Sequence, residues 1–130
     1  MNKLLFATAI VVLSAAPALA GEGLFCSGPD GIDISVPLGA GPGLSPLSAE
    51  IKAAGKVWTT AEGVAGTTQI IPAQSASVDN RLYLDFADPN YVGVVVEIRL
   101  FWAEEETDPV LGGTLRIAGH GAWPISCGMG

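Results

Sequence analysis

Residues that could activate a nucleophile or bind a metal ion are few in this chain. The one histidine, His120, lies between Gly119 and Gly121, in a sequence typical of an exposed tight turn. A general base needs an orienting acid and a nucleophile within reach, and zinc or copper sites need several His or Cys ligands. The Gly-x-Ser-x-Gly motif of hydrolases does not occur either. We therefore expect no catalytic residue, no metal and no cofactor.

Carboxylates are the most abundant reactive groups. The run Glu104-Glu105-Glu106, followed by Asp108, offers oxygen ligands but lacks the Asp-x-Asp-x-Asp-Gly spacing that directs alternate side chains to one calcium ion. A solvated hairpin loop after an expected strand at 92–102 explains the run more simply, and carboxylates there discourage edge-to-edge association. Thirteen acidic residues make some carboxylate pair inevitable, so hydrolysis of a glycan by two carboxylates remains an alternative function.

A polar stretch near the middle of the chain is the best candidate for binding a partner. It comprises Ser75, Ser77, Asn80 and Arg81. These residues could form the end of a binding loop, although a β-turn explains them as well.

Aromatic side chains could line a site for a sugar or an apolar ligand. The candidates are Trp58, Tyr83, Tyr91, Phe101 and Trp102. With only nine aromatic residues in the chain, we expect most of them to be needed in the core.

The first twenty residues have the three parts of a cleavable secretory signal. Lys3 precedes an apolar run over 4–16, and Pro17 then leads into the small-residue site 18–20. We expect cleavage between Ala20 and Gly21 and a periplasmic or secreted protein in which residues 21–130 form a single domain. The apolar run is shorter than the ~20 residues of a membrane span, so no membrane span is expected.

Two cysteines, Cys26 and Cys127, lie close to the two ends of the expected mature chain. An even number of cysteines in an oxidising compartment, without Cys-x-x-Cys spacing, predicts a structural disulfide. Closing a loop of about 100 residues stabilises the fold by roughly 4.7 kcal/mol in the chain-entropy model.

The charge of the mature chain excludes some partners. Once Lys3 is removed, five Lys and Arg residues stand against thirteen carboxylates, a net charge of −8. Nucleic acids and anionic lipids are bound by clustered cations, so neither is an expected partner. A cationic protein, or a small or glycan ligand, fits this charge, although like-charge repulsion also simply serves solubility.

Hydrophobic residues alternate with polar ones at a period of two almost throughout the mature chain, which is typical of half-buried antiparallel strands. Expected strands include 32–38, 49–54, 82–86, 92–102 and 115–117, with a single helical turn capped by Asp88. Turn signals include 39–46, 63–66, Asp108-Pro109, Gly112-Gly113 and 119–121. We expect an all-β domain of about eight strands, either a small β-sandwich or a closed β-barrel, with its ends tied by the disulfide.

The layout of a signal, an acidic all-β domain of about 110 residues and cysteines near both ends resembles that of the periplasmic inhibitors of C-type lysozyme. That resemblance implies a small barrel that inserts a polar loop into the cleft of a cationic enzyme. The family's inhibitory loop contains Ser and Gly followed by a basic residue. The nearest stretch here, 75–81, lacks the glycine and spaces Arg81 differently. The expected function is that of a binding or interaction module and not an enzyme, with inhibition of a cationic hydrolase such as lysozyme as one alternative.

Overall fold

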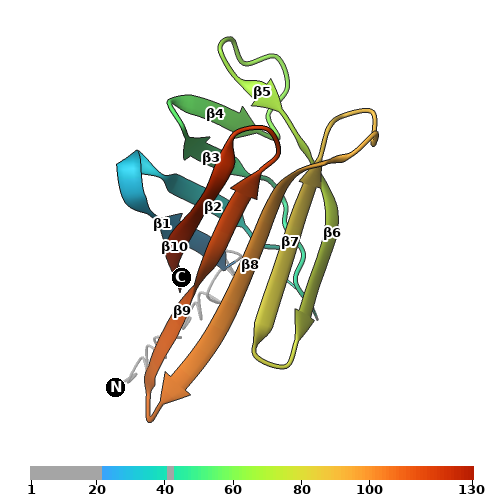
Figure 1. Ribbon diagram of the computed structural model, residues 1–130. Helices are drawn as coiled ribbons and strands as arrows, with labels where there is room; N and C mark the ends of the chain where they lie inside the picture. Colours follow the sequence, from blue (N-terminus) through green and yellow to red (C-terminus); the bar gives the residue numbers. More distant parts are fainter. Residues whose placement is uncertain (1–21, 41–42) are drawn as a thin grey trace, which may run out of the picture.

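The computed structural model describes residues 22–40 and 43–130, so the expected signal segment 1–20 and its cleavage site lie outside the described residues. The described chain forms ten strands and one 3-10 turn (Figure 1). They are β1 (Gly23–Ser27), η1 (Pro29–Gly31), β2 (Asp33–Pro37), β3 (Glu50–Ala53), β4 (Lys56–Thr59), β5 (Thr68–Gln69), β6 (Ile71–Val78), β7 (Arg81–Ala87), β8 (Val94–Glu105), β9 (Asp108–Ile117) and β10 (Gly121–Met129).

All ten strands belong to one sheet, in the order β5-β4-β3-β2-β1-β10-β9-β8-β7-β6. Neighbours are antiparallel except β4 and β5, which run parallel. β5 is the strand at one end of this order and β6 is the strand at the other. Only the buried Ile70 separates these two strands along the chain. Because these two consecutive strands form opposite ends of the sheet, the sheet curls round into a nearly closed barrel. The all-β prediction is confirmed, and the structure is a nearly closed barrel and not a sandwich.

The disulfide between Cys26 and Cys127 is confirmed. The two residues lie directly opposite each other on β1 and β10, with their Cα atoms 4.0 Å apart. The bond therefore joins neighbouring strands that are 101 residues apart in sequence. Such a bond is compatible with an extracytoplasmic location. No helix in the described part of the chain is long and apolar enough to cross a membrane.

The core consists of the inward-facing residues of the strands, as the period of two predicts. The largest fully buried side chains are Trp58, Phe86, Leu24, Ile34, Ile51, Ile70, Leu84, Ile98, Leu100, Leu115, Ile117 and Val36. Trp58 packs across one end of the barrel, where its ring lies nearly perpendicular to that of His120 in the β9–β10 turn, with the ring centroids 5.0 Å apart. Side chains fill this end, which we call the closed end. His120 itself is exposed in its turn, as expected.

Several local predictions need correction. Asp88 begins a single hydrogen-bonded turn, as expected, but the turn is a β-turn and not helical: the Tyr91 N–H donates to the Asp88 carbonyl at 2.9 Å. The Asp88 carboxylate accepts hydrogen bonds from the Gly93 N–H at 2.8 Å (Oδ1) and the Asn90 N–H at 3.2 Å (Oδ2). The Gly112-Gly113 pair lies inside β9 and forms no turn. At Gly113 an added Cβ would overlap the backbone oxygen of Arg99, so the neighbouring strand passes too close for any side chain.

The acidic hairpin is confirmed, but its two strands are longer and its turn is shorter than expected. Glu104 and Glu105 continue β8, and Asp108 already begins β9, so that the turn itself is only Glu106 and Thr107. In Figure 1 this hairpin extends past its neighbours at the lower end of the barrel.

The expectation that most of the five named aromatic residues lie in the core is wrong. Trp58 is buried and Tyr83 half-buried, but Tyr91, Phe101 and Trp102 are exposed. Tyr83 and Phe101 occupy outward positions on β7 and β8, because a barrel strand presents alternate residues to solvent. Trp102 faces inward but lies beyond the packed core.

Candidate functional site

The end of the barrel opposite Trp58 is open. A cavity of about 700 Å³ opens there between the start of β1, the β2–β3 connection, the β6–β7 hairpin, the β8–β9 hairpin and the end of β10. The lining residues are Glu22, Leu38, Gly39, Ala40, Gly43, Leu44, Ser77, Asp79, Asn80, Leu82, Trp102, Leu111 and Met129. We call this cavity the open end.

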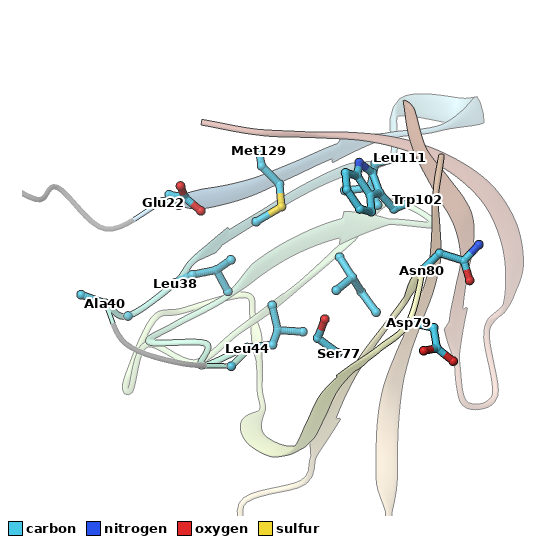
Figure 2. Close-up of a pocket in the computed structure, with 13 residues that line it drawn as sticks. Glu22, Leu38, Ala40, Leu44, Ser77, Asp79, Asn80, Trp102, Leu111 and Met129 are labelled. Carbon is cyan, nitrogen blue, oxygen red and sulfur yellow. The ribbon is translucent and has the colours of Figure 1, made fainter. Parts of the chain in front are cut away.

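Large apolar side chains form the wall of the open end. Trp102 and Leu111 lie directly opposite each other on β8 and β9, and they continue the inward-facing rows of the core. Leu111 is buried, whereas Trp102 remains 43% exposed and Met129 47% exposed. In Figure 2 the side chains of Trp102, Met129, Leu38 and Leu44 surround one shared space. The interior of the barrel is therefore continued to the surface by side chains that nothing in the described chain covers.

Polar groups form the rim. Ser77 faces the cavity from β6, because it pairs with the inward-facing Leu82. Asp79 and Asn80 form the β6–β7 turn, in which Asp79 has a positive φ of 54°. Glu22 lies on the other side of the opening from Asp79, whose carboxylate points away from the apolar centre (Figure 2). No Lys, Arg or His is among the described residues that line the open end.

A hydrogen bond joins the β2–β3 connection to β6 beside the open end. The Ser75 Oγ–H donates to the backbone carbonyl of Leu44 at 2.6 Å, across 31 residues of sequence. The same connection is folded by a bridge between Leu38 and Pro46. These contacts hold Leu44 over the gap between the two ends of the sheet and so complete the cavity wall.

The structure separates the four residues that the sequence singled out. Ser77 and Asn80 line the open end, and Ser75 secures the cavity wall through Leu44. Arg81 faces the opposite way, with its guanidinium carbon 5.2 Å from the centre of the Phe101 ring on the outer surface. Ser75 and Ser77 lie within strand β6, and the turn between the strands is only Asp79 and Asn80.

The remaining arginines are also on the outer surface and are paired. Arg99 Nη1 lies 2.7 Å from Asp85 Oδ1, and its guanidinium also lies 5.2 Å from the Tyr83 ring. Arg116 Nη1 lies 3.1 Å from Glu97 Oε2. These cross-strand pairs are typical of the solvated face of a sheet, so the guanidinium groups of Arg99 and Arg116 each have a carboxylate partner on that face.

Other chemically capable residues do not gather at one place. Within 22–40 and 43–130, no cluster of three or more His, Cys, Asp or Glu side chains has an arrangement that could hold a metal ion. His120 lies at the closed end, where its Nδ1 is 3.1 Å from the Ala118 carbonyl oxygen. The one carboxyl with a clearly shifted pKa is Asp88, whose pKa the Gly93 N–H and other backbone N–H groups lower. Asp88 lies in the β7–β8 connection, away from the cavity.

Comparison with protein-family models, with curated proteins and with solved structures found no match to this chain. The site therefore rests on its own geometry.

The sequence predicted part of this site and missed the rest. Ser77, Asn80 and Trp102 were all candidates, but Leu44, Leu82, Leu111 and Met129 were not, since each belongs to an ordinary alternating strand or loop. One usable signal was present. The inward row of β8 continues through Leu100 to Trp102 and runs directly into the acidic tip, which places a large aromatic side chain at the last inward position before solvent.

Proposed function

We propose that this protein is an extracytoplasmic binding module that takes an apolar group of its ligand into the open end of its barrel. The observation that carries the proposal is the uncovered apolar lining formed by Leu44, Leu82, Trp102 and Met129 around a cavity of about 700 Å³. Preformed concave sites with apolar walls and a few polar groups are where proteins bind small ligands, and the mouths of barrels are frequent locations. Leu82, Trp102 and Met129 lie on strands, and the backbone of Leu44 is held by the Ser75 hydroxyl, so the site exists before any ligand arrives.

A binding role is favoured over catalysis by the composition of the cavity. Its described polar side chains are Ser77, Asn80 and two carboxylates, with no base beside the serine hydroxyl. The carboxylates, Glu22 and Asp79, lie on opposite sides of the opening, and Asp79 points away from it (Figure 2). This arrangement gives no support to the two-carboxylate hydrolysis of a glycan, which needs both groups directed at one bond.

The extracytoplasmic location is supported by two independent features. One is the disulfide between Cys26 and Cys127, and the other is the sequence pattern of residues 1–20, which predicts export. Cleavage between Ala20 and Gly21 and placement in the periplasm or outside the cell are part of this proposal.

The proposal is tested by titration with N-phenyl-1-naphthylamine, a neutral probe whose fluorescence rises in apolar surroundings. We expect saturable binding to the wild type and a loss of about tenfold or more in affinity for Met129→Glu, because a carboxylate would then stand inside the apolar wall. Phe101→Ala is the matched control: Phe101 is 55% exposed beside Trp102 but on the outer surface. Equal binding by Met129→Glu and wild type would reject the open end as the site.

Inhibition of a cationic hydrolase remains a second candidate because one observation favours it. The β8–β9 hairpin carries Glu104, Glu105, Glu106 and Asp108 at a tip that extends past the barrel (Figure 1). Such a tip could enter a positively charged cleft. Inhibition of C-type lysozyme by the wild type, and its loss in the triple variant Glu104→Gln, Glu105→Gln and Glu106→Gln, would support this second role. Full activity of lysozyme in the presence of excess protein would exclude it.

A further inference from the structure

No Lys or Arg side chain within 22–40 and 43–130 lines the open end. Arg81, Arg99 and Arg116 lie on the outer surface of β7, β8 and β9, each against an aromatic ring or a carboxylate. Lys52 and Lys56 lie on β3 and β4 beside the turn that joins them, which belongs to the closed end. These five are the only Lys and Arg residues in 22–40 and 43–130.

Carboxylates, in contrast, gather at the open end. Glu22 and Asp79 are among the lining residues. The tip of the β8–β9 hairpin, on the strands that carry Trp102 and Leu111, adds four more carboxylates between Glu104 and Asp108. Cleavage before Gly21 would add one α-ammonium next to Glu22. Arg81, which follows the rim residue Asn80 on the outer face, adds a second positive charge, so that two positive charges stand against six negative ones and the potential of this end is negative.

The open end also contains an aromatic surface suited to a cation. Trp102 is 43% exposed, and its indole ring projects into the cavity (Figure 2). A tryptophan face attracts an ammonium or guanidinium group through the ring quadrupole. Apolar walls, an indole face and a rim without cations therefore occur together within one cavity.

We propose that the open end selects amphipathic organic cations, in which an aliphatic or aromatic body carries an ammonium group. The body enters between Leu44, Leu82 and Met129, and the ammonium remains at the rim, where it meets the Trp102 ring and the negative potential of Glu22 and Asp79. This inference rests on the proposed function and specifies the ligand class of the same site.

The test compares three small ligands that share one tail and differ in the head group. Decyltrimethylammonium, decyl maltoside and decyl sulfate are titrated, each below its micelle concentration, as competitors of N-phenyl-1-naphthylamine on protein that begins at Gly21. We expect the cation to bind about twofold to fivefold more tightly than the neutral maltoside at low salt, as for one partly exposed ion pair. The sulfate should bind most weakly. The preference should shrink at 1 M salt, where the Debye length is ~3 Å.

Charge variants distinguish the effect of the carboxylates at the rim from the effect of the net charge of the protein. Glu22→Gln with Asp79→Asn should reduce the preference for the cation, because the two carboxylates among the lining residues are lost, while leaving the affinity for decyl maltoside unchanged. The matched control, Asp30→Asn with Glu62→Gln, removes the same charge from η1 and the β4–β5 loop, which do not line the open end, and should retain the preference.

The outcomes are distinct. If all three ligands bind with equal affinity, the ligand class proposed here is wrong while the binding function stands. If none of them displaces the probe and the probe itself does not bind, both the inference and the proposed function fail. Equal loss of preference in the two double variants would show that net charge, and not the rim, attracts the cation, which would also overturn the inference.

Discussion

Gly113 lies where β9 passes close to the backbone of β8. A Cβ at this position would overlap the backbone oxygen of Arg99, and backbone atoms cannot move aside as a flexible side chain can. We expect Gly113→Ala to reduce the free energy of unfolding by about 1–3 kcal/mol, the usual range for an overfilled site. Urea denaturation measures this change.

Gly128 in β10 provides the control for that substitution. Nothing lies within 4 Å of a Cβ added there, and the residue is exposed. Gly128→Ala should leave stability unchanged or raise it by up to about 1 kcal/mol, because alanine restricts the unfolded chain. Equal effects of the two substitutions would contradict the close approach at Gly113.

Asp88 makes stability depend on pH at the acid end. Its pKa is lowered below the ordinary 3.8, first by the Gly93 N–H and then by other backbone N–H groups of the loop, so the folded state binds this proton more weakly than the unfolded state does. The carboxylate therefore stabilises the fold above about pH 4, and this contribution is lost as the pH falls through the lowered pKa. Thermal melts between pH 7 and pH 2 should show wild type and Asp88→Ala converging at the acid end. A constant difference over that range would show that the loop does not depend on the ionised carboxylate.

At the level of single residues, the sequence predicted what depends on composition and local pattern. Cys26 and Cys127 could be paired because there were only two cysteines, and His120 could be assigned to an exposed turn from its flanking glycines. The Gly112-Gly113 pair was assigned to a turn because the same residue type serves turns and close strand approaches. Only the position of Arg99 on the neighbouring strand distinguishes the two.

Strand β6 secures the wall of the open end through one side chain. Ser75→Ala removes the hydrogen bond from Oγ to the Leu44 carbonyl, and we expect a loss of about 0.5–1.5 kcal/mol in stability. Hydrogen exchange should also become faster at Gly39 and Leu47, whose N–H groups donate to Ser45 and Pro37 within the same connection.

Ser77 offers a matched control two residues away on the same face of β6. It is exposed, and no hydrogen bond is formed by its hydroxyl in the structure. Ser77→Ala should therefore leave exchange at Gly39 and Leu47 unchanged. If Ser75→Ala behaves in the same way as Ser77→Ala, the β2–β3 connection is held by other contacts.

At the level of elements, the strands with apolar inward faces were predictable and the strand without them was not. The patterns around Leu84 and Ile98 identify β7 and β8 from alternation alone. In β6 the inward positions near the open end carry Ser75 and Ser77, so no hydrophobic alternation marks them. The two-residue β5 is too short for any periodicity. Because β5 and β6 lie at the two ends of the sheet, closure into a barrel depends on the strands that the sequence marks least clearly.

For the molecule as a whole, the disulfide fixes the neighbouring first and last strands of the chain. In the chain-entropy model, a closed loop of this length stabilises the fold by roughly 4.7 kcal/mol, with the full value reached only when the bond is unstrained. Replacing Cys26 and Cys127 together by alanine should lower stability by several kcal/mol in urea denaturation and raise the m value, because the unfolded chain becomes less compact. Reduction of the wild type should have a similar effect. A double variant as stable as the oxidised protein would show that pairing of β1 with β10 needs no covalent bond.

The open end is a property of the whole barrel, and no local sequence pattern could place it. Trp58 and Trp102 both lie at inward positions of strands, yet one fills the closed end and the other remains exposed. The difference arises because His120 in the β9–β10 turn packs on Trp58 at one end, whereas Trp102 lines the cavity at the other.

The most direct test of the binding account uses the protein's three tryptophans, labelled with 5-fluorotryptophan and followed by ¹⁹F NMR. Trp102 lines the open end, Trp58 fills the closed end, and Trp123 lies on β10 near the β9–β10 turn. Addition of decyltrimethylammonium should shift the Trp102 resonance in a saturable manner and leave the other two unchanged. A titration in which the Trp102 resonance does not move, or in which all three move together, would contradict the assignment of the open end as the ligand site.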